Sequence, residues 1–219
     1  MGRAAVTDVV IGGGKVLATV LAAPIARTRY NRWGATDQEL ASPMPGDELV
    51  AAPKLGYTRA ITIEAPPERV WPWLVQIGQG RGGLYSFDGL ENLVGCDIHS
   101  SEEILPECQE LHPGDLIRLG RPGYPCFRVH SVSPPNTLVL VAADPKPPHD
   151  AATDDSPAGI ATWQWELRPA PDGRSTRLLV RQRLAYPRSM RLMWHLVEPI
   201  AYVMEREMLH GIRDRARRG

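Results

Sequence analysis

Cysteine is scarce in this sequence, and its spacing excludes two kinds of cross-link. Only Cys96, Cys108 and Cys126 occur among 219 residues, and no two of them have a CxxC spacing. Regularly paired cysteines are typical of secreted disulfide frameworks and of zinc sites. We therefore expect three reduced thiols in a cytoplasmic protein, with no disulfide, no metal site and no cofactor. A chain of this length buries about 70% of its unfolded surface, so it needs no such staple to fold.

An excess of either charge is also missing. The chain has 25 basic and 25 acidic residues, which gives a formal net charge of zero. Proteins that bind nucleic acid through its phosphates need a concentrated basic surface. Nucleic acid is therefore not an expected partner.

Long hydrophobic runs are the third absence. The longest run near the N-terminus, Val16 to Ala26, has 11 residues, and Gly12-Gly13-Gly14 interrupts the apolar residues before it. A membrane-spanning helix needs about 20 apolar residues. We predict that residues 1–55 form an amphipathic helix lying on the protein, followed by an extended, proline-rich linker.

Residues 9–32 nevertheless have one feature that favours a different interpretation. Arg27, Arg29 and Arg32 follow the apolar run. Basic residues beside an apolar helix are typical of segments that lie on an anionic membrane surface. Weak membrane contact through this segment is the alternative hypothesis.

The main domain is expected to span residues 56–219 and to begin with a strand followed by a helix. Over Tyr57–Glu64, Ile61 and Ile63 share one face of an alternating pattern, as in a half-buried strand. Pro66-Pro67 ends this strand and can start a helix, because a proline in the first turn loses no needed hydrogen bond. Pro72 lies within that helix and is expected to kink or shorten it.

A glycine cluster follows, and it matches a nucleotide-binding motif only formally. Gly78, Gly80 and Gly83 have the GxGxxG spacing. A dinucleotide site needs a strand before these glycines and a βαβ unit around them. The residues before them are helical in pattern, so we predict a loop between two helices rather than a dinucleotide site.

A second short helix is predicted over residues 84–95. Asp88 and Glu91 have the spacing of a capping box, and Gly95 stands where a helix commonly ends. The two carboxylates would lie on one helical face.

The second half of the chain is rich in strand patterns. The predicted strands are Asp115–Leu119, Cys126–Ser133, Thr137–Ala142, Ile160–Arg168 and Thr176–Leu184. Asp172-Gly173 predicts a hairpin between the last two. Ala143–Gly159 is acidic and proline-rich, which is typical of a lid or a disordered loop.

One long helix closes the chain, from about Arg188 to Arg218. Its apolar residues recur at spacings of three and four, namely Met190, Trp194, Val197, Ala201, Met204 and Met208. Pro199 is expected to bend it. The order of elements predicts an α+β helix-grip arrangement, in which a curved antiparallel sheet wraps a long C-terminal helix and two short helices follow the first strand.

Several segments make the chain resemble the SRPBCC superfamily, which includes START domains, polyketide cyclases and the birch-pollen allergen. They are ITIEAPPERVWPWL from Ile61, the Gly114-Asp115 turn, the Trp163-Gln164-Trp165 strand and the long closing helix. The blocks VQIGQGRGGLYSFDGLENLVGCDIHS and MEREMLHGIRDRA, with the upstream WGAT and PGDEL, are similar to an uncharacterised bacterial branch. The resemblance implies a cavity for a hydrophobic small molecule, such as a lipid or polyketide-like compound. It implies no single activity, since one fold hosts many functions.

The cavity of such a fold would lie between the sheet and the last helix. Its expected ligand-binding residues are Arg81, Trp163, Trp165, Trp194, Ala201 and Met204. Arg81 would anchor an anionic group of the ligand. An equal alternative is that Arg81 pairs with Asp88 and fixes the glycine loop.

Catalysis is the competing hypothesis, in which a cyclase or hydrolase uses Asp88, Glu91 or His99. Paired carboxylates can act as acid and base when burial separates their pKa values. The simpler interpretation is a helix cap and a solvated acid. Asp97 and His99 are too few for a metal site. Binding of an apolar ligand is the leading hypothesis, and a membrane-associated lipid-handling protein is the third.

Overall fold

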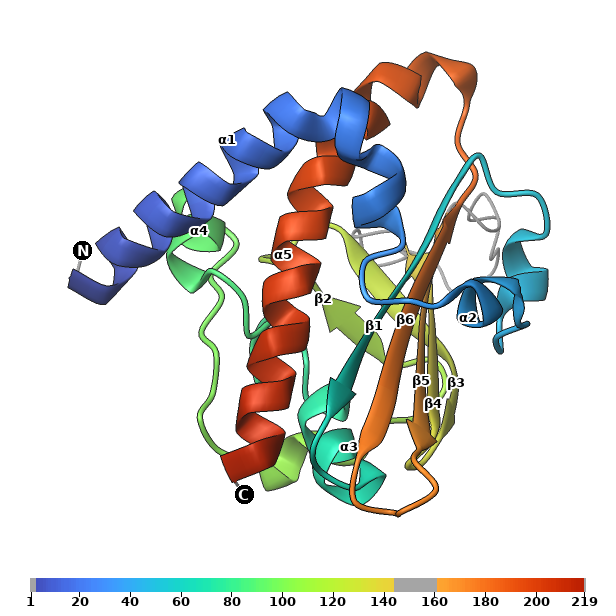
Figure 1. Ribbon diagram of the computed structural model, residues 1–219. Coiled ribbons are helices and arrows are strands. Elements are labelled where there is room, and N and C mark those ends of the chain that lie inside the picture. The colour runs from blue at the N-terminus through green and yellow to red at the C-terminus, as the bar shows by residue number, and fades with distance from the viewer. Residues whose placement is uncertain (1–2, 144–160, 219) are drawn as a thin grey trace, which may run out of the picture.

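A long helix, α5 (Arg191–Arg218), lies across one face of a six-stranded antiparallel sheet in the computed structural model, which describes residues 3–143 and 161–218 (Figure 1). The sheet is open, with the strand order β1-β6-β5-β4-β3-β2. The strands are β1 Leu55–Ile63, β2 Leu116–Arg118, β3 Cys126–Ser133, β4 Thr137–Ala143, β5 Ala161–Pro169 and β6 Thr176–Leu184. This architecture is a helix-grip fold, so the predicted α+β class is confirmed.

The helices agree with the sequence prediction in the main domain. They are α3 Pro67–Val75, α4 Asp88–Leu93 and α5, with the short 3-10 turns η2 Pro106–Cys108 and η3 Arg188–Met190. Two short helices therefore follow β1, as predicted. The first turns of α5, before Pro199, run at an angle to the rest of the helix (Figure 1). The loop predicted over Ala143–Gly159 lies outside the described residues, apart from Ala143 at the end of β4.

The core forms between the inward face of the sheet and the helices α3 and α5. Alternation along the strands turns every second side chain inward. The inward residues of β5 and β6 include Trp163, Trp165, Leu178 and Val180, all of which are buried. They pack against α5 residues such as Ile212, which is also buried.

The glycine cluster after α3 forms a turn, as predicted. Gly78 and Gly83 pair in an isolated antiparallel bridge, and both have positive φ, 125° and 80°. A Cβ atom at Gly83 would lie 2.6 Å from the Ser100 Cα atom, so this turn requires glycine there. A helix, and not a strand, precedes the cluster, which confirms that GxGxxG is not a dinucleotide motif here.

The segment predicted as an extended linker is folded onto the sheet. It contains α2 (Asp37–Ala41), which a Thr36–Glu39 capping box starts, and η1 (Asp47–Val50). Arg181 of β6 is buried and donates to Asp47 at 2.7 Å and to the carbonyls of Ser42 and Glu39. The linker prediction is wrong because arginines on the outer face of the sheet supply donors for this segment's backbone.

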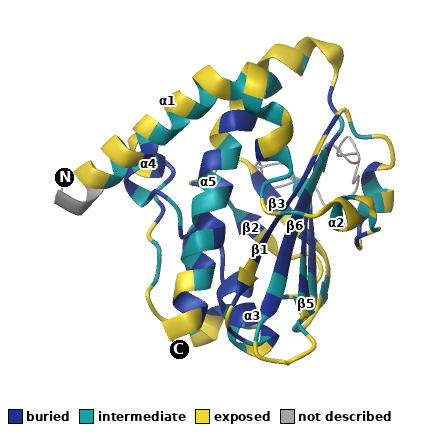
Figure 2. Ribbon diagram, in the orientation of Figure 1, coloured by how far each residue is buried: buried dark blue, intermediate teal, exposed yellow. Residues whose placement is uncertain are grey.

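The N-terminal helix α1 (Arg3–Asn31) is continuous, although three glycines interrupt its apolar sequence. Gly12 packs on the ring of Phe87, where a Cβ atom would lie 2.9 Å from the ring. This contact compensates for the low helix propensity of glycine. By length and composition Val6–Asn31 meets the requirements of a membrane-spanning helix, and no other helix in the described residues does. Only 6% of its most apolar window is buried, so much of α1 is exposed (Figure 2).

Candidate functional site

A charged pair lies at the centre of the grip, between β1 and α5. Arg59 is 0% exposed, Glu205 is 4% exposed, and Arg59 Nη1 donates to Glu205 Oε2 at 2.5 Å. The other carboxylate oxygen accepts from Trp163 Nε1 at 3.1 Å and from Gln182 Nε2 at 3.4 Å. Both oxygens are hydrogen-bonded, which offsets the cost of removing the charge from water.

Aromatic rings enclose the Arg59 guanidinium, and a hydrogen bond ties it to α1. Its Cζ atom lies 3.8 Å from the ring centroid of Tyr57 and 5.1 Å from that of Tyr202. Its Nε donates to the Tyr30 carbonyl of α1 at 2.9 Å. Burial, assisted by the Glu205 charge, raises the pKa of Tyr57 far above its ordinary value, so this phenol stays protonated. Arg59 thus joins β1, α5 and α1.

Neither member of this pair was among the residues selected from the sequence, although a signal for each is present. Arg59 lies two residues from Tyr57 and two from Ile61, so the three side chains share one face of β1. This places a charge on the inward face. Glu205 lies seven residues after Glu198 and seven before Ile212, and all three are buried on α5. A charge within an inward pattern is the signal for such a centre.

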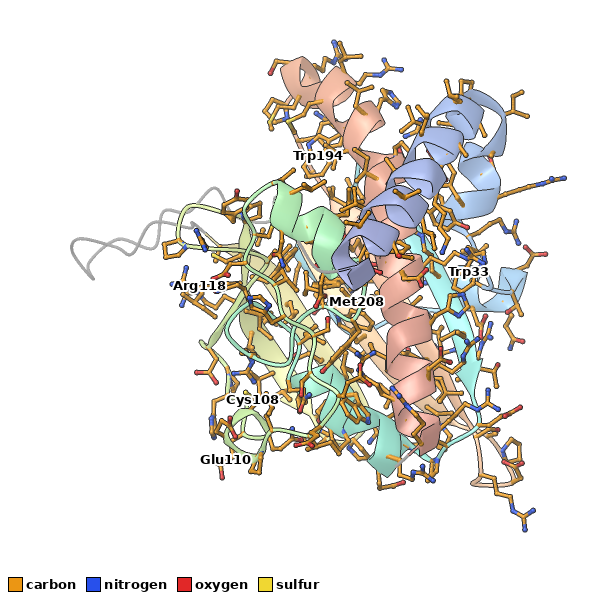
Figure 3. The ribbon with its side chains drawn as sticks, turned by 90° about the vertical axis from the view of Figure 1, so that its left-hand side faces the viewer. Trp33, Cys108, Glu110, Arg118, Trp194 and Met208 are labelled. Atoms are coloured by element: carbon orange, nitrogen blue, oxygen red, sulfur yellow. The ribbon has the colours of Figure 1, made fainter. Side chains whose placement is uncertain are left out.

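The expected ligand-binding residues divide into two groups. Trp163 and Trp165 are buried in the core with ring centroids 5.0 Å apart. Trp194, Ala201 and Met204 are half-buried on α5. Trp194 lies at the upper end of α5, above Met208 (Figure 3), and its ring is 5.8 Å from that of Tyr186. The structure therefore brings Trp163 to the charged pair and places Trp194 in the first turn of α5.

A hollow of about 770 Å³ opens at the edge strand β1, beneath the end of α1. Asn31, Tyr57 and Gln182 are among the residues that line it. Tyr57 and Gln182 also contact the charged pair, so their side chains separate the hollow from Arg59 and Glu205.

The Arg81 guanidinium donates hydrogen bonds to backbone carbonyls. Its Nη2 donates to the carbonyl of Val75 at 3.0 Å and to that of Cys108 at 2.8 Å. These bonds hold the end of α3 to η2. The predicted pair with Asp88 is wrong, because both Asp88 oxygens accept from Ser100, one from its N–H and one from its hydroxyl, each at 2.6 Å.

The acids of α4 do not form the predicted capping box. Phe87 occupies the N-cap position, and no side chain caps the helix. Glu91 is buried and accepts from Ser86 Oγ at 2.5 Å, while its Oε2 has no hydrogen-bond partner in the described residues. The pKa of Glu91 is raised to about 7, mainly by burial; the Ser86 hydrogen bond opposes this shift and the Asp88 charge adds to it. Glu91 is therefore not the solvated acid that the sequence suggested.

His99 lies on an exposed loop. Its side chain is 80% exposed, and its Nε2 is 3.3 Å from Asp97 Oδ1, while Arg121 Nε is 3.4 Å from the other Asp97 oxygen. The Arg121 hydrogen bond and charge lower the pKa of Asp97. Within residues 3–143 and 161–218, no group of three or more histidine, cysteine or acidic side chains is placed to hold a metal ion.

An exposed hydrophobic surface, here called the apolar face, covers α1 and the first turns of α5. Ile25 is 93% exposed, Leu21 is 74% exposed and Leu192 is 71% exposed. The α1 members are Val6, Val10, Ile11, Leu17, Leu21 and Ile25, and the α5 members are Leu192, Met193, Leu196, Val197 and Ile200. The second half of α1 and the first turns of α5 lie at the same end of the molecule, whereas the first half of α1 extends to one side (Figure 2).

Polar contacts fix α1 to the rest of the protein. Lys15 Nζ pairs with Glu207 at 3.0 Å, and Arg27 forms two contacts with the buried Glu198, at 2.8 Å and 3.0 Å. Asn31 also donates to Glu198. The outer side of α1 is therefore apolar, and its inner side carries both charged and apolar residues, so α1 does not have the polar outer side of the amphipathic helix predicted.

Comparison with known proteins gives no family assignment. No protein-family model and no curated protein matches the chain. Among solved structures, a protein from Arthrobacter aurescens has 18% identity and a TM-score of 0.42, over 82% of this chain and 92% of that one. Aha1 from Colwellia psychrerythraea has 16% identity and a TM-score of 0.37, over 73% and 94%. An HSP90 activator from Plasmodium falciparum has 10% identity and a TM-score of 0.41, over 72% and 93%. Similarity this low carries no conclusion about activity or partners.

Proposed function

We propose that this protein is a peripheral membrane protein of the cytoplasm, in which the apolar face docks the helix-grip domain on a lipid bilayer, where it handles a lipid-like ligand. The exposure of the apolar face is the observation that carries the proposal. Monomeric soluble proteins rarely expose contiguous apolar patches larger than a few hundred Å². Full burial of one leucine or isoleucine side chain is worth about 1.5–3 kcal/mol, so these side chains together supply a strong driving force.

The attachment of α1 favours a helix that lies along the membrane over one that crosses it. Lys15 in the first half of α1 pairs with Glu207, and Arg27 near its end pairs with Glu198. A helix held to the domain in both halves presents one long side to the bilayer. Interfacial helices insert an apolar side to a depth of about 5–10 Å in this way.

Basic residues beside the apolar face favour an anionic membrane. Arg29, Arg188 and Arg191 are exposed next to it. Each arginine near an anionic surface contributes about 1 kcal/mol of attraction. This charge makes a bilayer a better occupant of the face than a second copy of the chain, which would bring like charges together.

Sedimentation of the full-length protein with vesicles tests the proposal. The wild type should pellet with phosphatidylglycerol-containing vesicles, and Leu21→Glu with Ile25→Glu should weaken binding at least tenfold, because charges enter apolar lipid at high cost. Arg174→Glu is the matched control, since it makes the same change in net charge at the exposed β5–β6 turn. A wild type that stays in the supernatant with every vesicle would contradict docking. A dimer that Leu21→Glu dissociates would assign the face to a second copy instead.

The ligand part of the proposal rests on three half-buried side chains of α5. The half-buried Trp194, Ala201 and Met204 lie on α5 next to the apolar face, so a lipid leaving the bilayer would meet them first. The resemblance to the SRPBCC superfamily, in a bacterial branch, supports a hydrophobic small molecule. Native mass spectrometry should detect a retained lipid in the wild type, and Ala201→Trp should block its uptake while the protein stays folded. A wild-type protein that neither retains nor exchanges a lipid would contradict ligand binding.

A further inference from the structure

A second hollow, of about 570 Å³, lies between the Tyr85-Ser86 turn and the last turns of α5. Ser86, His210 and Arg217 are among its lining residues. This volume is within the range of small-molecule sites. The hollow is separate from the apolar face and takes no part in the function proposed above.

Ser86 follows a strained residue and faces this hollow. Tyr85 has a φ of 55°, which is a left-handed conformation uncommon for a bulky residue. Its N–H donates to Ser100 Oγ at 2.9 Å, and Ser100 is itself held by Asp88. On the other side, Gly211 of α5 approaches so closely that a Cβ atom there would lie 2.3 Å from the Tyr85 carbonyl oxygen. Strain held by its surroundings is frequent at functional sites.

The Ser86 hydroxyl has a carboxylate as its hydrogen-bond partner. Ser86 Oγ donates to Glu91 Oε1 at 2.5 Å, and Glu91 is buried behind it. A pKa of about 7 suits a general base that works near neutral pH. A hydroxyl paired with such a base is the arrangement that activates a serine nucleophile.

We propose that Ser86 and Glu91 form an acyl-transfer site, which hydrolyses a small carboxylic ester bearing an anionic group. Ser86 Oγ attacks the ester carbonyl carbon while its proton moves to Glu91, and the alcohol then leaves with that proton. Water attacks the resulting acyl-serine, Glu91 takes the water's proton, and Ser86 recovers it when the carboxylic acid departs. The sum is ester plus water to acid plus alcohol.

Two arginines that line the hollow favour an anionic substrate, while its acidic residues are paired elsewhere, Glu207 with Lys15 and Asp214 with Arg213. Arg217 pairs with Glu64 and Arg218 with Glu102, but all four side chains are exposed. Exposed ion pairs contribute little, so both guanidinium groups can turn to an anionic substrate. His210 also lines the hollow, and burial lowers the pKa of its imidazole. A neutral imidazole in the hollow can donate a hydrogen bond to the reacting oxygen.

Covalent labelling of the full-length protein with a fluorophosphonate tests the nucleophile directly. The phosphorus forms a bond to Ser86 Oγ and fluoride leaves, so intact-mass analysis should find one adduct, which peptide mapping places on Ser86. Ser86→Ala should abolish the adduct, and Glu91→Gln should slow labelling at least 100-fold. Ser189→Ala, at an exposed serine of η3, is the control and should label like the wild type. Folded wild-type protein that takes no adduct on Ser86, or Glu91→Gln that labels at the wild-type rate, would overturn the proposal.

Substrate preference is tested with two nitrophenyl esters. The mono-p-nitrophenyl ester of succinate carries a carboxylate and should have a kcat/KM at least tenfold above that of p-nitrophenyl acetate. Arg217→Ser with Arg218→Ser should lower kcat/KM for the succinate ester at least tenfold, so that the ratio between the two esters falls to about one. If neither ester is turned over faster by the wild type than by Ser86→Ala, the site is not an esterase. The wild-type protein must by itself take the label on Ser86 and hydrolyse the ester. The proposal can therefore fail even if a variant does not fold.

Discussion

The interior of the grip buries charged side chains, whereas the outer side of α1 exposes apolar ones. Inside, Arg59 and Glu205 are charged and completely enclosed. Outside, Leu21 and Ile25 are apolar and more than two-thirds exposed. The interior charges have several hydrogen-bond partners, whereas no neighbour among the described residues buries the exposed apolar side chains.

This difference indicates that the two regions were shaped by different requirements. The paired, buried charges fix the position of three elements, because an alternative packing would leave a charge unpaired. Exposed apolar side chains add little to the free energy of folding, so folding alone does not explain their presence on α1. Substitutions in the two regions separate the requirements of folding from those of the exposed surface.

Removal of one charge from the interior pair should have the largest effect. Glu205→Ala leaves Arg59 buried without its carboxylate, which costs about 3–5 kcal/mol in comparable buried pairs. Urea unfolding should therefore show a marked loss of stability. Glu207→Ala is the matched control, two residues along the same helix, because its pair with Lys15 is partly exposed and worth about 1 kcal/mol or less. Equal losses in both variants would mean that the interior pair has no special role.

This pair also marks the limit of what the sequence predicted. The strands, the order of elements and the long closing helix followed from alternation and helical spacing, which are local patterns. The Arg59–Glu205 pair joins residues 146 positions apart, and neither residue alone says which partner it will meet. The same limitation applies to Arg81, since backbone carbonyls leave no pattern in a sequence.

Glu91 should give the next largest effect, and it should depend on pH. Its folded-state pKa is raised from 4.5 to about 7, so the folded protein binds a proton more tightly than the unfolded chain. Its contribution is therefore full below pH 4.5 and is lost as pH rises to about 7, by about 3 kcal/mol in total. The ionisable neighbours are Asp88 and Cys96, and Lys15 lies over the adjacent Phe87 ring.

Unfolding measurements between pH 5 and pH 8 on wild type and Glu91→Gln check this sign. The difference in stability between them should change by about 3 kcal/mol over that range, in favour of the glutamine variant at high pH. A difference that stays constant with pH would show that Glu91 is not the group that titrates.

The outer face of the sheet provides an intermediate case. Arg181 is buried there and bonds Asp47, Thr58 and three backbone carbonyls, so it holds the segment with α2 and η1 in place. Arg181→Met should cost about 2 kcal/mol, because these acceptors lose a charged donor. Hydrogen exchange should also become faster in residues 37–50. Arg174→Met at the exposed hairpin is the control, and slower or unchanged exchange in the segment would contradict the assignment.

The regular structure in both parts of residues 1–55 could not be predicted from the sequence, and the physical reason is the same in both. Three consecutive glycines predict a break in a helix, and prolines predict an extended linker, when only local propensity is considered. Gly12 is instead required by the Phe87 ring, and the proline-rich segment finds donors on β6. Tertiary contacts overrode local preference in both places.

Polar substitution on the outer side of α1 should have the smallest effect on folding. Leu21→Ser and Ile25→Ser change side chains that are already in water, so each should alter the free energy of unfolding by less than about 0.5 kcal/mol. Urea unfolding without lipid checks this expectation. If these variants instead lose several kcal/mol, the apolar face is part of a folded interface, such as a dimer. If stability holds while vesicle binding falls, the exposed side chains act on the membrane and not on the fold, which separates the outer surface from the enclosed charges of the grip.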